Sequence, residues 1–294
     1  VLTAALTLLM ALPLAACSSG TSSSSAGSGS SGSVSSAGGG EESYKIAIVR
    51  QLDHASMNEI RDAITAELEA KGEELGITIE CGNFNGNNDT STLSQIGAQI
   101  IADGYDAIIP IGTLAAQQMV STAEETQTPV IYGTVSYPEV ANLTGIDYVT
   151  GTSDALNVTL LLDMMLAADS DIQTVGLLYS KSEDSSKKPI EEAKAFLDAS
   201  GISYVEKTGT NTDEVNSAVD ALISAGVEAI FTPTDNTVMQ AELSIFEKLN
   251  EAKIPHYTGA NSFALNGAFF GYGVDYDDLG AETADMVVDL LVNG

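Results

Sequence analysis

The feature that most constrains the fold of this chain is an alternation of short apolar runs with helical segments, which begins near residue 45 and restarts near residue 175. Short apolar runs bounded by turn residues indicate buried strands, and apolar residues spaced three or four apart indicate helices. Strands that alternate with helices in this way predict a parallel sheet covered by helices. The predicted strands are residues 45–49, 77–79, 107–111 and 129–132 in the first half, and 175–179, 202–205, 229–231 and 255–257 in the second.

The two halves also match each other element by element. Residues 104–109 (Gly-Tyr-Asp-Ala-Ile-Ile) correspond to residues 226–231 (Gly-Val-Glu-Ala-Ile-Phe), and residues 127–133 correspond to residues 252–259 with one residue inserted. Such a match favours two similar lobes over one continuous sheet. The predicted fold class is therefore α/β, with two Rossmann-like lobes that each contain a parallel sheet and are joined by a hinge.

The composition restricts the classes of function. The chain has 294 residues, of which 41 are acidic and 11 basic, and its net charge is −30. Nucleic acid is a poor partner because phosphate binding needs basic patches. An enzyme is not expected, since no Gly-x-Ser-x-Gly motif occurs and neither histidine, His54 or His256, lies beside a nucleophile. Neither histidine has neighbours at metal-ligand spacing, so no metal or cofactor is expected.

The N-terminal segment predicts where the protein works. An apolar stretch leads into Leu14-Ala15-Ala16-Cys17, and a tract of almost only Ser and Gly follows. The apolar stretch is shorter than the roughly 20 residues of a transmembrane helix and suits a signal-peptide core. The pattern resembles a bacterial lipoprotein signal, in which cleavage leaves the cysteine as a lipid-carrying N-terminus. We therefore expect a signal peptide with lipidated Cys17 at residues 1–17, a tether at residues 18–41, and a folded part outside the cytoplasm that is held to the membrane by lipid alone.

The loops after the predicted strands form the candidate binding site, because ligands of open parallel sheets bind beyond the carboxyl ends of the strands. Helix N-termini there suit a carboxylate, and an aspartate suits an ammonium group. Asp235 or Asp154 is the predicted ammonium acceptor, and Tyr137 and Tyr179 are predicted to stack on a ligand side chain. The candidate binding residues are Asp53, His54, Gly112, Thr113, Ser136, Tyr137, Thr152, Ser153, Asp154, Tyr179, Ser185, Ser186, Thr234, Asp235, Asn236 and Gly259.

Some of these residues have an alternative, purely structural interpretation. Tyr179 equally suits the core, and His54 equally suits an ordinary loop position. The stretch at residues 83–88 is most simply a turn-rich loop. Residues that precede predicted helices equally suit N-caps, and these are Thr113, Ser153, Ser185 and Asp235.

The order and spacing of several motifs resemble one protein family, the ABC-transporter substrate-binding lipoproteins of the tryptophan/tyrosine type. The chain departs from the family pattern at Asp53-His54-Ala55, where Glu-His-Pro is usual, and at Asp184-Ser185-Ser186, where Asn usually precedes the serine. The motifs that carry the resemblance are residues 45–49 followed by Asp53-His54, then Gly112-Thr113, Gly151-Thr152-Ser153-Asp154, residues 175–179 with residues 182–186, Thr234-Asp235-Asn236 and residues 273–280.

The resemblance implies a two-lobed solute receptor of the type I periplasmic-binding-protein class. Such a receptor captures an amino acid, aromatic or branched, by hinge closure and delivers it to a membrane permease with a cytoplasmic ATPase. The ATPase is a separate chain, because no P-loop occurs here. In two-lobed binding proteins the last segments commonly return to the first lobe. Residues 42–154 plus 268–294 are therefore expected to form lobe 1, and residues 155–267 lobe 2.

Two alternatives stay open for the function. The first is a sugar receptor on the same fold, which ranks below an amino-acid receptor because sugar sites usually present paired aromatic faces and this chain has no Trp. The second is a ligand sensor for a membrane kinase, which the sequence does not separate from a transport receptor.

Overall fold

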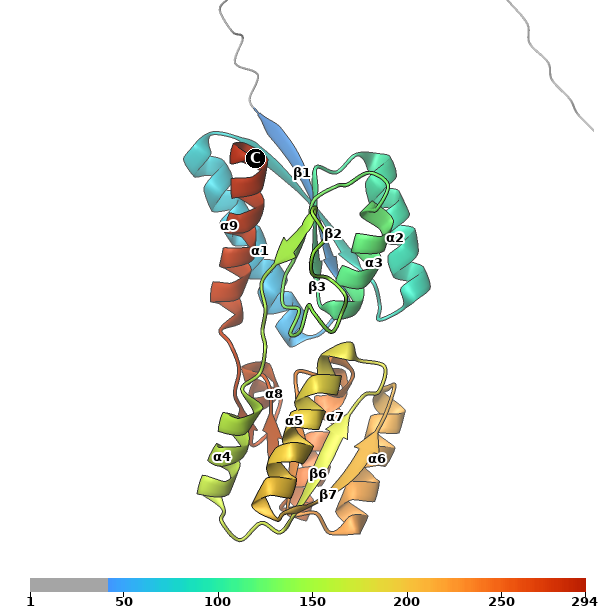
Figure 1. Cartoon of the computed structure of the whole chain (residues 1–294), viewed down its shortest axis with the longest axis vertical. Coiled ribbons are helices and arrows are strands. Elements are labelled where there is room, and N and C mark those ends of the chain that lie inside the picture. The colour runs from blue at the N-terminus through green and yellow to red at the C-terminus, as the bar shows by residue number, and fades with distance from the viewer. Residues whose placement is uncertain (1–41) are drawn as a thin grey trace, which may run out of the picture. The chain divides into compact units, whose positions relative to one another are not determined.

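The computed structural model describes residues 42–294, which fall within one compact unit. They form two five-stranded parallel sheets, with strand orders β2-β1-β3-β4-β5 and β10-β9-β8-β6-β7 (Figure 1). The predicted fold class of two α/β lobes with parallel sheets is confirmed. Within the described range, no helix is both long and apolar enough to span a membrane. The predicted lipidation site, Cys17, and the predicted tether lie outside the described residues.

Helices cover both faces of the first sheet. In β1, Ile46 and Ile48 pack toward α1 and α9, whereas Ala47 and Val49 pack toward α2 and α3, because side chains alternate between the faces of a strand. The strands are β1 (Ser43–Arg50), β2 (Thr78–Asn85), β3 (Ala107–Ile111), β4 (Val130–Tyr132) and β5 (Val149–Gly151). The helices are α1 (Ala55–Leu75), α2 (Thr90–Asp103), α3 (Thr113–Ala123) and α9 (Tyr276–Asn293).

The second lobe has the same layered plan. In β6, Val175 and Leu177 pack toward α4 and α5, and Leu178 packs toward α6 and α7. The strands are β6 (Thr174–Tyr179), β7 (Ser203–Thr208), β8 (Ala229–Thr232), β9 (His256–Thr258) and β10 (Phe270–Gly271). The helices are α4 (Val158–Ala168), α5 (Asp184–Ser200), α6 (Thr212–Ala225), α7 (Asn236–Ala252) and α8 (Asn261–Leu265).

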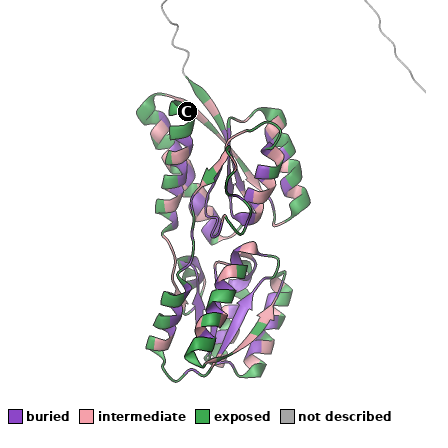
Figure 2. Cartoon of the chain, viewed as in Figure 1, coloured by how far each residue is buried: buried purple, intermediate pink, exposed green. Residues whose placement is uncertain are grey.

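The central strands are continuous apolar runs because helices cover both of their faces. Every residue of β3 and of β8 is buried, and the buried residues gather toward the centre of each lobe (Figure 2). The matched glycines Gly104 and Gly226 end α2 and α6 with φ values of 67° and 72°. Glycine tolerates this left-handed conformation, so the repeated Gly marks the turn that leads into β3 and β8.

The structure differs from the sequence-based prediction in three respects: the sheet that one strand joins, three elements that were not predicted, and one segment expected to be a loop. β10 pairs with β9 in the second sheet, so Phe270 and Gly271 do not belong to lobe 1 as expected. An apolar run signals a strand but does not reveal which sheet it joins. The elements β5, α4 and α8 are absent from the sequence-based prediction. Residues 83–85 of the expected turn-rich loop lie in β2, where they pair with β1.

The returning helix α9 packs closely against α1. A Cβ atom on Gly280 would lie 2.7 Å from the Cβ atom of Ala63 and 3.0 Å from the carbonyl oxygen of Ile60. Both neighbours belong to the α1 backbone or lie next to it, so they have little room to move. The absence of a side chain at position 280 therefore sets the distance between the two helices.

We expect Gly280→Val to lower the free energy of unfolding by about 1–3 kcal/mol, because overpacking a close contact forces the helices apart. The matched control is Glu282→Val, which places the same side chain at an exposed position of the same helix and should change stability by no more than about 0.5 kcal/mol. Denaturant titrations of both variants measure the difference. Equal midpoints for the two variants would contradict the close packing of α1 and α9.

Candidate functional site

A cavity lies between the two lobes, at the carboxyl ends of the strands. About 400 Å³ of space there is not filled by atoms, and part of it is open to solvent. Its position is the one at which open parallel sheets bind ligands. The lining residues are His54, Ser56, Met57, Ile60, Gly112, Thr113, Thr134, Ser136, Asp154, Ser185, Thr234, Asp235, Asn236, Met239, Ala260, Phe263 and Tyr276.

Asp154 supplies the cavity with a buried carboxylate. The Ser136 hydroxyl donates to one carboxylate oxygen at 2.7 Å, and the Tyr276 hydroxyl donates to the other at 3.3 Å. Burial raises the pKa of Asp154. Among the described residues, no Lys or Arg forms an ion pair with this carboxylate. Because a buried charge is costly unless it is paired, a cationic group of a ligand would stabilise Asp154.

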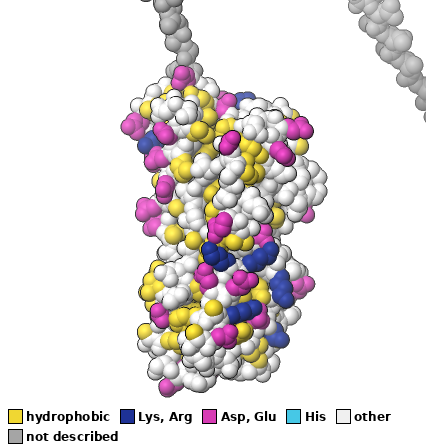
Figure 3. Space-filling view, viewed as in Figure 1, with side chains coloured by type: hydrophobic (Ala, Val, Ile, Leu, Met, Phe, Trp, Pro, Cys, Tyr) yellow, Lys and Arg dark blue, Asp and Glu magenta, His cyan; other side chains and the backbone are white. Residues whose placement is uncertain are grey.

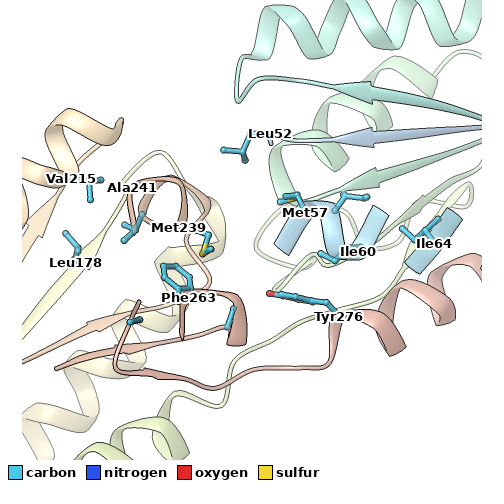
Figure 4. Packing of buried hydrophobic residues seen from close by; sticks show 14 of the residues in the cluster. Leu52, Met57, Ile60, Ile64, Leu178, Val215, Met239, Ala241, Phe263 and Tyr276 are labelled. Carbon is cyan, nitrogen blue, oxygen red and sulfur yellow. The ribbon is translucent and has the colours of Figure 1, made fainter. Parts of the chain in front are cut away.

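Another part of the cavity wall is apolar. Met57 and Ile60 of α1 and Tyr276 of α9 come from the first lobe, and Met239 of α7 and Phe263 of α8 come from the second (Figure 4). All five side chains are buried. Apolar surface that faces a cavity favours a ligand with an apolar or aromatic part.

Five helices begin at the cavity: α1, α3, α5, α7 and α8. Among the longer ones, α3 with N-cap Gly112 and α5 with N-cap Glu183, one from each lobe, have no side-chain cap. The first N–H groups of such helices suit an anion, which the helix dipole also favours, and in α3 one of them, the Leu114 N–H, already donates to Gln51 Oε1 at 3.0 Å. Thr113 and Ser185 follow these caps and place hydroxyl groups along the cavity. This pair of helix ends is the strongest candidate for holding a ligand carboxylate.

Polar contacts join the two lobes around the cavity. His54 Nε2 lies 3.0 Å from Asn236 Oδ1, and Ser136 Oγ lies 3.3 Å from Thr234 Oγ1. Further polar pairs between the lobes are Ser56 with Ser262, Gln51 with Glu183, Gln117 with Asp184, and Glu139 with Lys188.

On the outer surface, basic side chains gather near the level where the lobes meet, and the rest of this face is mostly acidic or uncharged (Figure 3).

The model of one protein family, described as ABC transporter substrate binding protein, matches residues 45–293. The chain belongs to this family. The resemblance expected from the sequence motifs is thereby confirmed, and the family and fold are those of a substrate-binding protein and not of an enzyme. Substrate-binding proteins of ABC importers work outside the cytoplasm, which agrees with the expected location.

Known proteins similar to this substrate-binding protein include two with named amino-acid ligands. A curated "Tyrosine-binding protein" of Clostridioides difficile is 26% identical over 251 residues, which are 84% of this chain and 72% of the relative. A Streptococcus pneumonia structure in complex with L-Trp is 29% identical, covers 86% of both chains and has a TM-score of 0.80. A ligand-free, open substrate-binding protein of Clostridium difficile is 28% identical, covers 85% of both chains and has a TM-score of 0.61.

In this substrate-binding protein Asp235 caps a helix. One carboxylate oxygen accepts from the Val238 N–H at 2.9 Å, and the other accepts from the Ser180 N–H at 2.7 Å and the Ser186 hydroxyl at 2.6 Å. Burial raises the pKa of Asp235. Although Asp235 borders the cavity, its oxygens are already occupied by protein donors. Of the two predicted ammonium acceptors, Asp154 is therefore the better placed.

Two predicted stacking residues point away from the cavity. The Tyr137 ring lies under the Lys188 ammonium group, 4.5 Å from the ring centroid, and its hydroxyl donates to the Leu156 carbonyl at 3.4 Å. The Tyr179 hydroxyl donates to Glu206 at 2.8 Å, and its ring joins the core beside α4 and α5. The other candidate residues that do not line the cavity are Asp53, Thr152, Ser153, Ser186 and Gly259.

Five residues with polar groups at or near the cavity were not among the candidates: Ser56 and Tyr276, which line it, and Glu183, Gln51 and Thr134. Glu183 and Gln51 are buried and contact each other between the lobes. Burial, followed by the charge of Asp235, raises the pKa of Glu183 to about 7. Thr134 lines the cavity with φ of 59°, which is strained for a β-branched residue. The position of Glu183 in the loop between β6 and α5 was a usable signal, whereas the strain at Thr134 has no sequence signature.

Proposed function

We propose that this substrate-binding protein captures an amino acid with an apolar or aromatic side chain in the cavity between its lobes and delivers it to the permease of an ABC importer. The observation that carries the proposal is the buried carboxylate of Asp154, which has no cationic protein partner among the described residues. A ligand ammonium group would supply the missing charge. A sugar has no cationic group and would leave this carboxylate uncompensated.

The other groups of an amino acid also find suitable surroundings in the cavity. The N-termini of α3 and α5, with Thr113 and Ser185, would hold the carboxylate. The wall formed by Met57, Met239 and Phe263 would hold the side chain. The tyrosine-binding relative and the L-Trp complex support the choice of an aromatic amino acid.

The proposed mechanism is closure of the two lobes over the ligand. At almost the same sequence identity, this chain is more similar to the structure that holds L-Trp than to the open, ligand-free one. The difference supports a closed arrangement here and an open one before capture. The bending segments would be those between β5 and α4 and between β10 and α9, where the chain crosses between the sheets. Lobe 1 would then comprise residues 42–154 with α9, and lobe 2 the residues between these segments.

The location of the protein completes the proposal. Lipid on Cys17 would anchor it to the membrane, and the Ser/Gly tether would let the folded part reach a permease. The acidic surface would keep it away from anionic headgroups.

Thermal-shift measurements on the folded part test the ligand class. We expect L-tryptophan, L-tyrosine or a branched amino acid to raise the melting temperature, with a stabilisation of about 2.7 kcal/mol at a ligand concentration 100 times Kd. Tryptamine and indole-3-propionate, which lack the carboxylate and the ammonium group respectively, should each stabilise far less. Stabilisation by ribose or myo-inositol and by no amino acid would contradict the proposal.

A further inference from the structure

Glu183 lies at the meeting point of two hydrogen-bond chains that start in the opposite lobe. It is buried, with 4% of its surface exposed, and follows β6 in the second lobe. It is not among the residues that line the cavity. Any effect on the ligand must therefore pass through other residues.

The first chain starts at the N-terminus of α1. The Met57 N–H donates to His54 Nδ1 at 3.4 Å, so the proton of the neutral ring is on Nε2. Burial lowers the pKa of His54 to about 4, so the ring is neutral at physiological pH. His54 Nε2 then donates to Asn236 Oδ1 at 3.0 Å, and Asn236 Nδ2 donates to Glu183 Oε2 at 3.1 Å. Every donor in this hydrogen-bond chain points toward the carboxylate of Glu183.

The second chain starts at the N-terminus of α3. The Leu114 N–H donates to Gln51 Oε1 at 3.0 Å, and Gln51 Nε2 donates to Glu183 Oε1 at 3.4 Å. Within the second lobe, the Thr237 hydroxyl adds a donor to the same oxygen at 3.1 Å. The contacts of His54 with Asn236 and of Gln51 with Glu183 cross between the lobes, so separation of the lobes would break both.

We propose that Glu183 is a positioning residue for lobe closure: its carboxylate is the acceptor on which donors from the first lobe converge when the lobes close over the ligand. The inference rests on the proposed function, since it concerns how the same cavity closes. His54 and Asn236 line the cavity, so the network that joins the lobes also fixes two side chains beside the ligand. Three donors, from Gln51, Asn236 and Thr237, reach the two carboxyl oxygens of Glu183.

The ionisation of Glu183 links closure to pH. In the closed arrangement burial raises its pKa to about 7, and water that enters between separated lobes would return the pKa toward its ordinary value of about 4.5. The closed state is therefore favoured most below pH 4.5, and this advantage is lost as the pH rises through about 7. The other ionisable groups near Glu183 are Asp235, Asp184 with its partner Lys187, and His54, which titrates below this range.

Calorimetric titration with L-tryptophan between pH 5 and pH 8 tests the inference on three proteins: wild type, Glu183→Gln and Glu191→Gln. A difference of one pKa unit between the open and closed states corresponds to a tenfold change in affinity. We expect Kd of the wild type to increase about tenfold or more from pH 5 to pH 8, and Kd of Glu183→Gln to stay level. Glu191→Gln removes an exposed acid from the same helix and should follow the wild type.

A second variant keeps the test valid if Glu183→Gln does not fold. Gln51→Ala removes one donor and leaves the Glu183 carboxyl in place. Because a donor stabilises the charged carboxylate more than the neutral acid, this variant should lose more affinity at pH 8 than at pH 5. A wild-type Kd that does not vary with pH, or a Glu183→Gln variant that keeps the wild-type profile, would overturn the role of Glu183. The absence of any L-tryptophan or L-tyrosine binding by the wild type would instead overturn the proposed function.

Discussion

Asp154→Asn is expected to reduce the affinity for an amino acid by two orders of magnitude or more. The substitution removes the charge but keeps the shape of the side chain, so a ligand ammonium group would enter a buried site without its counter-ion. Losing one member of a buried, hydrogen-bonded charge pair costs about 2–5 kcal/mol. Calorimetry with L-tryptophan measures the change directly.

The control for this substitution is Asp53→Asn, which removes an exposed acid at the neighbouring edge of the first sheet. It should bind L-tryptophan as the wild type does. In the absence of ligand, Asp154→Asn should be at least as stable as the wild type, because it no longer buries an unpaired charge. If Asp154→Asn keeps its affinity, the ammonium group of the ligand lies elsewhere in the cavity.

Asp235→Ala is expected to lower the free energy of unfolding by about 3–5 kcal/mol. The substitution removes an N-cap and leaves two buried donors, the Ser180 N–H and the Ser186 hydroxyl, without an acceptor. Its carboxylate holds the first turn of α7 and fixes Ser180 and Ser186 at the start of the neighbouring loop. Differential scanning calorimetry of the ligand-free protein checks this expectation.

The matched control is Asp89→Ala, which removes the exposed N-cap of α2, where the carboxylate accepts from the Thr92 N–H at 2.7 Å. Loss of an exposed cap should cost only about 1 kcal/mol. If Asp235→Ala unfolds at the wild-type temperature and loses ligand affinity, Asp235 binds the ammonium group directly, as the sequence alone allowed.

The sequence predicted the two-lobed fold because its central strands are buried on both faces. In β3 every residue is apolar and in β8 only Thr232 is polar, and a helix with a row of buried residues follows each of them. β5 escaped prediction because it is a short edge strand whose residues are half-buried or exposed. α4 escaped because its sequence, Val-Thr-Leu-Leu-Leu-Asp-Met-Met-Leu-Ala-Ala, is apolar on nearly every side and gives little periodic contrast.

The sequence placed the candidate site at the strand ends but did not determine which side chains face the cavity. Asp154 and Asp235 both follow strands, and only their hydrogen-bond partners separate a carboxylate held by two hydroxyl groups from one that caps a helix. The apolar wall was missed because Met57, Ile60 and Phe263 lie within helices, where an apolar residue signals the core. The alternation along β6 places Tyr179 on the same face as Val175 and Leu177, so the sequence already favoured the core alternative for this residue.

The two methionines in the cavity wall bear on the range of ligands that the protein can bind. Met57 and Met239 face the cavity from opposite lobes, and an unbranched thioether adapts to neighbours of different outline at little cost. A cavity lined by such flexible side chains would bind several amino acids of related shape, one at a time. One importer would then serve them all, and their relative abundance outside the cell would decide which is taken up first.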